Sequence, residues 1–154
     1  MMTSSGMRIE PLTPAIGAEL TGIDLGQVTP DLVEEIRGAL LEHKVVFFRD
    51  QHISREQHIE FARQFGELEI HPATPKDQPS PEVLRIAHGP ESRGSENMWH
   101  SDVTWREEPS LGSILRALDV PAVGGDTLFA NMYAAYESLS PAMQSFVETL
   151  TAKH

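Results

Sequence analysis

Two stretches of the N-terminal half repeat their apolar residues at the spacing of an amphipathic helix. The first begins at Thr29, an N-cap residue followed directly by proline, and we expect it to run to about His43. The second begins at Ser54, which forms a capping-box pattern with Gln57, and Gly66 is a natural stop. The apolar faces of the two predicted helices are Leu32, Val33, Ile36, Leu40 and Leu41 in the first, and Ile59, Phe61, Ala62 and Phe65 in the second.

The other apolar segments have the length of strands. Residues 7–25 mix β-branched residues with Gly and Pro, which indicates short strands broken by turns. Residues 44–49, KVVFFR, form a continuous apolar run that predicts a buried central strand. Four later strands are expected at EVLRIA (82–87), MWHSDVTW (98–105), GSILRALDV (112–120) and DTLFAN (126–131), and a last helix from Ser140 to near Ala152.

This order of elements predicts an α+β or mainly β fold, with an antiparallel sheet or part of a barrel. The number of expected strands is too small to close a barrel, so the inner face of such a sheet would stay uncovered. We expect residues 1–6 to be a disordered leader and residues 7–154 to be one portion of a single domain.

The charge and composition narrow the classes of partner. The chain has 154 residues, and its 23 acidic and 12 basic residues leave a net charge of −11, which excludes nucleic acid and an anionic membrane as expected partners. It has no cysteine, so neither a disulfide framework nor a thiolate site is possible. It shows no signal-peptide pattern and no apolar run of membrane-spanning length, which favours a cytoplasmic protein.

The candidate chemistry lies in the stretch NMWHSDVTW, residues 97–105. On a strand, His100 and Asp102 would project from the same face, and one imidazole with one carboxylate makes two-thirds of the facial triad of non-haem Fe(II) oxygenases. The flanking Trp99 and Trp105 could keep such a site dry. The alternative is that the two polar residues are neighbours by chance, because a single His-x-Asp pair is a weak motif.

Read together, several segments resemble the taurine dioxygenase (TauD/TfdA-like) family of Fe(II)- and 2-oxoglutarate-dependent dioxygenases. The segments are IGAELTGIDL, HKVVFFRDQHIS, FARQFGELEIHP, WHSDVTW, VPAVGGDTLFAN and AAYESLSP, and they extend over nearly all of the chain from residue 8 onward. The resemblance implies a double-stranded β-helix, the jelly roll of clavaminate synthase-like proteins, with flanking helices. Only part of that barrel would lie within these 154 residues.

The resemblance also implies roles for individual residues. His100 and Asp102 take the places of two Fe(II) ligands, and Thr127 of the GGDT segment takes the place of a threonine that binds a carboxylate of 2-oxoglutarate. His71 takes the place of a histidine that touches the anionic group of the substrate, and the backbone N–H of Val103 would contact substrate. Asn97 matches an asparagine near the co-substrate or the substrate.

Two departures from the taurine-specific members bear on the substrate. Thr74 stands where those members have a tyrosine that helps to hold the amine of taurine, and Glu96 stands where they have an asparagine. Trp105 could line the pocket with apolar surface. The expected substrate is therefore a small anionic alkyl sulfonate or alkyl sulfate, with Fe(II), 2-oxoglutarate and O2 as cofactor and co-substrates. The products would be succinate, CO2, an aldehyde, and sulfite or sulfate.

The third Fe(II) ligand and the arginine that would hold 2-oxoglutarate have no candidate in the chain, which matches the N-terminal portion of the family's longer sequences. We therefore expect the 154-residue segment alone to be inactive, and the whole protein to be a homo-oligomer. Three alternatives stay open at this point: an inactive or non-enzymatic metal-binding module, a dioxygenase for a non-sulfur anion such as an aryloxyalkanoate, and a different cupin-like metalloprotein.

Overall fold

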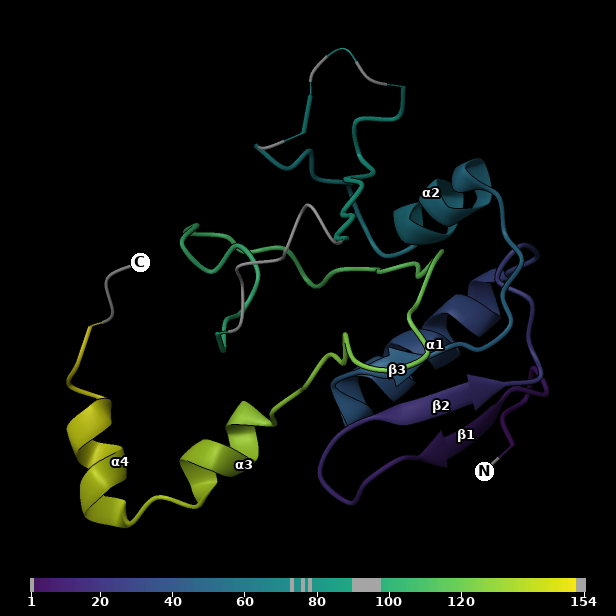
Figure 1. Ribbon diagram of the computed structural model, residues 1–154. Helices are drawn as coiled ribbons and strands as arrows, with labels where there is room; N and C mark the ends of the chain where they lie inside the picture. Colours follow the sequence, from purple (N-terminus) through teal and green to yellow (C-terminus); the bar gives the residue numbers. More distant parts are fainter. Residues whose placement is uncertain (1, 73, 76, 78, 90–97, 152–154) are drawn as a thin grey trace. The chain divides into compact units, whose positions relative to one another are not determined.

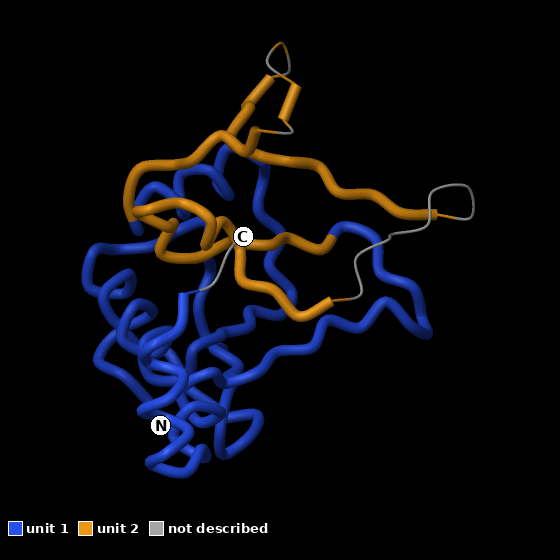
Figure 2. The backbone as a smooth tube through the Cα atoms, turned by 90° about the vertical axis from the view of Figure 1, so that its left-hand side faces the viewer, with its two compact units in different colours: residues 1–65, 118–153 blue, residues 66–117, 154 orange. Residues whose placement is uncertain are grey.

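The chain forms two compact units in the computed structural model, which describes residues 2–72, 74–75, 77, 79–89 and 98–151. Unit 1 comprises residues 1–65 and 118–153, and unit 2 comprises residues 66–117 with residue 154 (Figure 2). All of the helices and strands in the described residues belong to unit 1. They are β1 (Arg8–Pro11), β2 (Ala18–Thr21), α1 (Pro30–His43), β3 (Val46–Phe47), α2 (Arg55–Arg63), α3 (Met132–Glu137) and α4 (Pro141–Val147) (Figure 1).

The three strands form one sheet in the order β1-β2-β3. β1 and β2 are antiparallel, and their register pairs Arg8 with Thr21. β2 and β3 are parallel, and their register pairs Ala18 with Val46. Parallel neighbours need a crossover connection, which α1 supplies between β2 and β3 (Figure 1).

Helix α1 has the bounds that the sequence predicts. The Thr29 side chain accepts a hydrogen bond from the Leu32 N–H at 3.3 Å, and Pro30 occupies the first turn, where no N–H partner is needed. The helix ends where Lys44 adopts the left-handed conformation, with φ of 67°, and its N–H donates to the Leu40 carbonyl. These local contacts explain why the sequence alone locates both ends of this helix.

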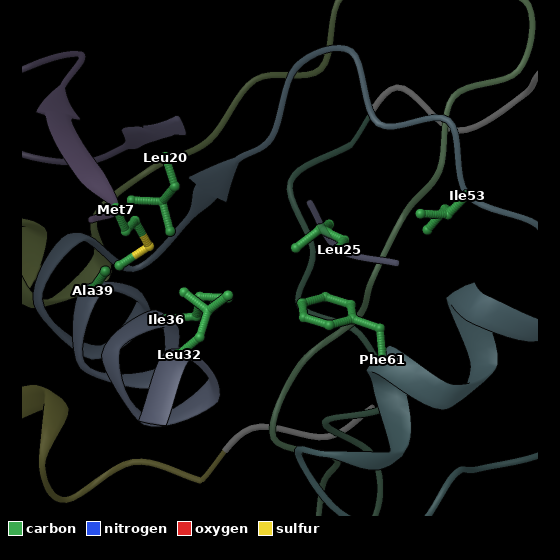
Figure 3. Packing of buried hydrophobic residues seen from close by; sticks show 8 residues of the cluster. All are labelled: Met7, Leu20, Leu25, Leu32, Ile36, Ala39, Ile53 and Phe61. Carbon is green, nitrogen blue, oxygen red and sulfur yellow. The ribbon is translucent and has the colours of Figure 1, made fainter. Parts of the chain in front are cut away.

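The core is an apolar cluster between the sheet, α1 and α2 (Figure 3). Met7 and Leu20 contribute from the β1–β2 side, and Ile36 contributes from α1 with only 2% of its surface exposed. Phe61 of α2 contacts the rings of Phe48 and Phe65 edge to face, with centroids 6.1 and 5.2 Å away. The remaining buried members are Leu25, Leu32, Ala39 and Ile53.

The predicted capping box at the start of α2 is confirmed. Ser54 Oγ accepts from the Gln57 N–H at 3.2 Å, and Gln57 Oε1 accepts from the Ser54 N–H at 2.7 Å. The short strands expected within residues 7–25 are confirmed as β1 and β2.

The expectations for the rest of the chain need correction. β3 covers two residues of the expected strand 44–49, and it is a half-buried edge strand rather than a buried central one. The described residues of 82–87, 98–105, 112–120 and 126–131 include no strand residue. A strand exists through hydrogen bonds to a neighbouring strand, and these segments have no such ladder within the described residues. The last helix ends at Val147 rather than near Ala152, and α3, with Asn131 as its N-cap, was not predicted.

The segment expected to be a leader contacts α1 in this structure. The Glu35 carboxylate accepts hydrogen bonds from the hydroxyls of Ser4 (2.5 Å), Ser5 and Thr3 (2.6 Å), and from the Ser5 N–H at 3.2 Å. These hydrogen bonds, that of Ser4 foremost, lower the pKa of Glu35 from an ordinary 4.5 to about 2. The charged form of Glu35 therefore holds residues 3–5 against the helix.

We predict that the Ile36→Ala variant loses about 2–5 kcal/mol of unfolding free energy, because it removes buried methyl groups and leaves a cavity in the core. Leu41→Ala on the same helix is the matched control, since Leu41 is 66% exposed and its loss should cost no more than about 0.5 kcal/mol. Urea unfolding measures both. Equal losses in the two variants would contradict the burial assignment.

We predict that the contact between Glu35 and residues 3–5 is lost on acidification. The pKa of Glu35 is depressed in the folded state, so its contribution is complete above about pH 4.5 and disappears as the pH falls towards 2. The Ser5 amide resonance, followed by NMR, should titrate with a midpoint near 2. The Glu35→Gln variant should abolish that titration, and Glu34→Gln, on the neighbouring residue, should leave it unchanged. A midpoint near 4.5 would rule out the contact.

Candidate functional site

His100 and Asp102 lie in a loop of unit 2, in residues that carry no helix or strand. His100 Nε2 and Asp102 Oδ1 are 3.4 Å apart, and both side chains are largely exposed. The sequence predicts that a strand places them on one face. In the structure the two side chains lie close together as expected, although neither residue belongs to a strand.

The hydrogen bonds of His100 determine which ring nitrogen faces Asp102. Nδ1 lies 3.0 Å from the Met98 carbonyl oxygen, and a carbonyl can only accept, so Nδ1 carries the proton that is donated. In the neutral ring, Nε2 then presents a lone pair to a carboxylate oxygen. Two acceptors at 3.4 Å repel each other unless a proton or a metal ion lies between them.

The geometry of the pair fits two ligands of one metal ion. Ligand atoms about 2.1 Å from an ion and at right angles to each other are about 3 Å apart, close to the observed separation. A backbone carbonyl on the far nitrogen of a metal-binding histidine is the usual outer contact, which orients the ring. Within the described residues, no group of three or more His, Asp or Glu side chains could hold a metal, so the third ligand of a facial triad is not located.

The second oxygen of Asp102 has a partner of its own. The Ser113 hydroxyl donates to Asp102 Oδ2 at 2.8 Å, across the loop of residues 103–112. This contact was missed in the sequence, because no spacing rule links a serine to a carboxylate eleven residues earlier. The two oxygens of Asp102 therefore face different groups, Oδ1 towards His100 and Oδ2 towards Ser113.

The residues after Asp102 form a turn of unusual conformation. Val103 has φ of +49°, a left-handed conformation that β-branched residues rarely adopt, and its carbonyl accepts from the Arg106 N–H at 3.1 Å. Trp99 and Trp105 are 69% and 58% exposed, so the expectation that they keep the pair dry is not met within this chain.

A polar network in unit 2 holds the end of this turn. The Arg106 guanidinium forms an ion pair with Glu69 and lies 5.0 Å from the centre of the Trp105 ring. The Ser110 hydroxyl donates to the other oxygen of Glu69. Arg106 Nε is buried without a hydrogen-bond partner among the described residues. Both side chains are partly buried, so removing Glu69 would leave a partly buried cation without its counter-charge.

The other predicted site residues lie in several parts of the chain. His71 is exposed, and its carbonyl accepts from the Thr74 N–H at 2.8 Å. Thr74 is buried, with 6% exposure, and its hydroxyl has no partner among the described residues. Thr127 is exposed and belongs to unit 1, after Gly124 and Gly125, which both have a positive φ. Asn97 and Glu96 lie outside the described residues.

None of the described helices combines the length and the apolar character needed to cross a bilayer.

Comparison with known proteins identifies the class to which this fold and site belong. The family model of the taurine catabolism dioxygenase TauD, TfdA family matches residues 8–154. The chain belongs to this family.

Individual relatives show how much of the domain the chain represents. It is 39% identical to an alkylsulfatase of Acinetobacter baylyi over 150 residues, which is 96% of this chain and 47% of that protein. It is 38% identical to an alpha-ketoglutarate-dependent sulfate ester dioxygenase of Pseudomonas putida, over 95% of this chain and 48% of that protein. The crystal structure of a taurine dioxygenase from Burkholderia xenovorans superimposes with a TM-score of 0.78 and 40% identity, over 93% of this chain and 51% of that chain. The chain thus spans about half the length of the relatives it matches.

Proposed function

We propose that the protein is an Fe(II)- and 2-oxoglutarate-dependent dioxygenase that oxidises an alkyl sulfate or alkyl sulfonate. The observation that carries the proposal is the approach of His100 Nε2 to Asp102 Oδ1 in a chain of the TauD/TfdA family. The complete domain is a jelly roll with flanking helices, to which this chain contributes the small sheet and the helices described above.

The roles of the chain's own residues are those that the resemblance to the family implies. His100 and Asp102 hold Fe(II) as two of three ligands and leave positions for 2-oxoglutarate and O2. Thr127 donates its hydroxyl to a carboxylate of 2-oxoglutarate, and Asn97 contacts the same co-substrate or the substrate. The bound metal and keto acid supply the oxidising power for hydroxylation of a C–H bond, with release of succinate and CO2.

The substrate end of the site would hold an anion on a short apolar chain. His71 and the Val103 N–H contact the sulfate or sulfonate, and Trp105, held by Arg106, covers the alkyl part. Hydroxylation of the carbon beside the leaving group gives an unstable adduct, which collapses to an aldehyde and sulfate or sulfite. Thr74 replaces the phenol that would hold the amine of taurine. Glu96 is the residue that opposes this proposal, because a carboxylate there would pair with an ammonium group if it faced the substrate.

A second candidate substrate is an aryloxyalkanoate. The chain is 36% identical to an (S)-phenoxypropionate/alpha-ketoglutarate-dioxygenase of Sphingobium herbicidovorans, over 98% of this chain and 54% of that protein. The two candidates share an anionic head group but differ in its geometry and in the size of the apolar part. The remaining alternatives are an inactive metal-binding module and a cupin-like enzyme of another reaction class. The expected homo-oligomer stays a prediction.

We predict that Asp102→Ala abolishes metal-dependent turnover in the full-length protein without unfolding it, because the carboxylate is exposed and its loss leaves one protein ligand in this chain. Adding 2-oxoglutarate to the Fe(II) protein without oxygen should give the weak visible band of a chelated keto acid, and the variant should lack it. Asp119→Ala, which removes another exposed aspartate, is the matched control. Full succinate release by Asp102→Ala at saturating iron would refute the role of Asp102. Absence of the band in the unchanged protein would favour the binding module or another reaction class.

We predict that hexyl sulfate and hexanesulfonate are better substrates than taurine. Each buried CH2 contributes about 0.8 kcal/mol, so four more carbons contribute roughly 3 kcal/mol, over a hundredfold in binding. The six-carbon compounds lack the amine of taurine, and losing a hydrogen bond from that charged group costs about 1.5–3 kcal/mol of binding free energy. This loss at most offsets the gain from the longer chain. Succinate release measures kcat/KM for the three compounds and for 2-phenoxypropionate. A tenfold preference for taurine that Glu96→Gln removes would show that Glu96 binds the amine. A preference for phenoxypropionate would select the second candidate.

A further inference from the structure

We infer that Ser113 is the positioning residue of the metal-binding carboxylate, which it holds so that Asp102 binds the metal through Oδ1 alone. The inference rests on the proposed function and adds a residue that the comparison with relatives does not assign. Its basis is the hydrogen bond from Ser113 Oγ to Asp102 Oδ2 at 2.8 Å, together with the 3.4 Å approach of Oδ1 to His100 Nε2.

The direction of the hydrogen bond follows from the chemistry of the two groups. An ionised carboxylate can only accept, so the Ser113 hydroxyl donates its proton to Oδ2. Asp102 Oδ2 thereby has its partner in Ser113, while Oδ1 faces His100 Nε2 at 3.4 Å. One carboxylate oxygen, Oδ2, thus accepts from Ser113, and the other, Oδ1, is left to bind the metal.

This division matters for the number of coordination positions that remain. A carboxylate that chelates through both oxygens occupies two positions on the ion, whereas a facial triad needs each protein ligand to occupy one, so that three stay open. The Ser113 hydroxyl competes with the metal for Oδ2 and so favours the one-oxygen mode. Hydrogen bonds to the outer oxygen of a metal-binding carboxylate also orient it.

Because the site is exposed, the orientation of Asp102 depends more on the hydrogen bond from Ser113 than on packing. Both His100 and Asp102 are more than half exposed and lie in a loop, so little packing restricts the Asp102 side chain. Ser113 contacts Asp102 from the far side of the loop of residues 103–112, so the same hydrogen bond also links the two ends of that loop. Ser113 is itself exposed, and its hydroxyl should therefore contribute little to the folding of the metal-free protein.

The experiment compares Ser113→Ala with two other variants of the full-length protein. Ser113→Thr keeps a hydroxyl at the same place. Ser110→Ala removes a hydroxyl from the same segment, but one that donates to Glu69 rather than to Asp102. Metal affinity is measured directly by titration with Mn(II), followed by the electron paramagnetic resonance signal of the free ion, without reference to turnover.

We expect Ser113→Ala to weaken Mn(II) binding by about 10–100-fold, the usual effect of removing an outer contact of a metal ligand. Ser113→Thr should restore most of the affinity, and Ser110→Ala should keep that of the unchanged protein. The Tm of the metal-free protein should be the same in Ser113→Ala, while the rise in Tm on adding Mn(II) should shrink. A purely structural role would lower the metal-free Tm and leave the Mn(II)-induced rise intact.

The outcomes separate this inference from the proposed function on which it rests. If Asp102→Ala loses Mn(II) binding but Ser113→Ala binds as the unchanged protein does, the positioning role is wrong and the metal site stands. Failure of Ser113→Thr to restore affinity, or a fall in the metal-free Tm with an unchanged Mn(II)-induced rise, would likewise overturn it. If Asp102→Ala binds Mn(II) as tightly as the unchanged protein, the metal site and the role of Ser113 both fail.

Discussion

The packing of α1 against the β1–β2 hairpin is the interaction on which the small sheet of this protein depends. Ile36 is nearly inaccessible to solvent in a cluster with Met7 and Leu20, and this contact fixes the helix that connects two parallel strands. A short sheet of this kind buries too little surface to persist without a helix on its face. The hydrogen bonds of Glu35 to residues 3–5 add an electrostatic contact at the edge of the same helix.

Unit 2 is held in a different way. Its described residues carry no helix or strand, and its conformation around the candidate site depends on polar side chains that reach across loops. Glu69 pairs with Arg106, and Ser113 holds Asp102. Such contacts stabilise unit 2 through charge and hydrogen-bond geometry rather than through burial of apolar surface. The loss of one partner therefore removes the whole contact. A metal ion between His100 and Asp102 would add the strongest local attraction in this unit.

This division between units suits the proposed chemistry. The apolar core lies in unit 1, while the pair that would bind the metal lies on an exposed loop of unit 2. The Met98 carbonyl and the Ser113 hydroxyl orient the two ligands from outside, one on the imidazole and one on the carboxylate. The arrangement directs Nε2 and Oδ1 towards each other, where the repulsion of two acceptors becomes the attraction of two ligands once a cation binds.

The sequence by itself determined the features that depend on near neighbours in the chain. Thr29 with Pro30 locates the start of α1, and the reciprocal hydrogen bonds of Ser54 and Gln57 locate the start of α2, because caps act within one turn. The candidate pair was visible because only Ser101 separates His100 from Asp102.

Only the tertiary structure decided what depends on distant partners. The apolar segments after residue 98 look like strands, yet a strand requires a hydrogen-bonded neighbour, and these segments form no such pairing within the described residues. The pair lies in a loop rather than on a strand face, and Ser113 reaches Asp102 across residues 103–112. Neither contact follows from periodicity, because loop geometry is set by the contacts that close it and not by a repeating backbone angle.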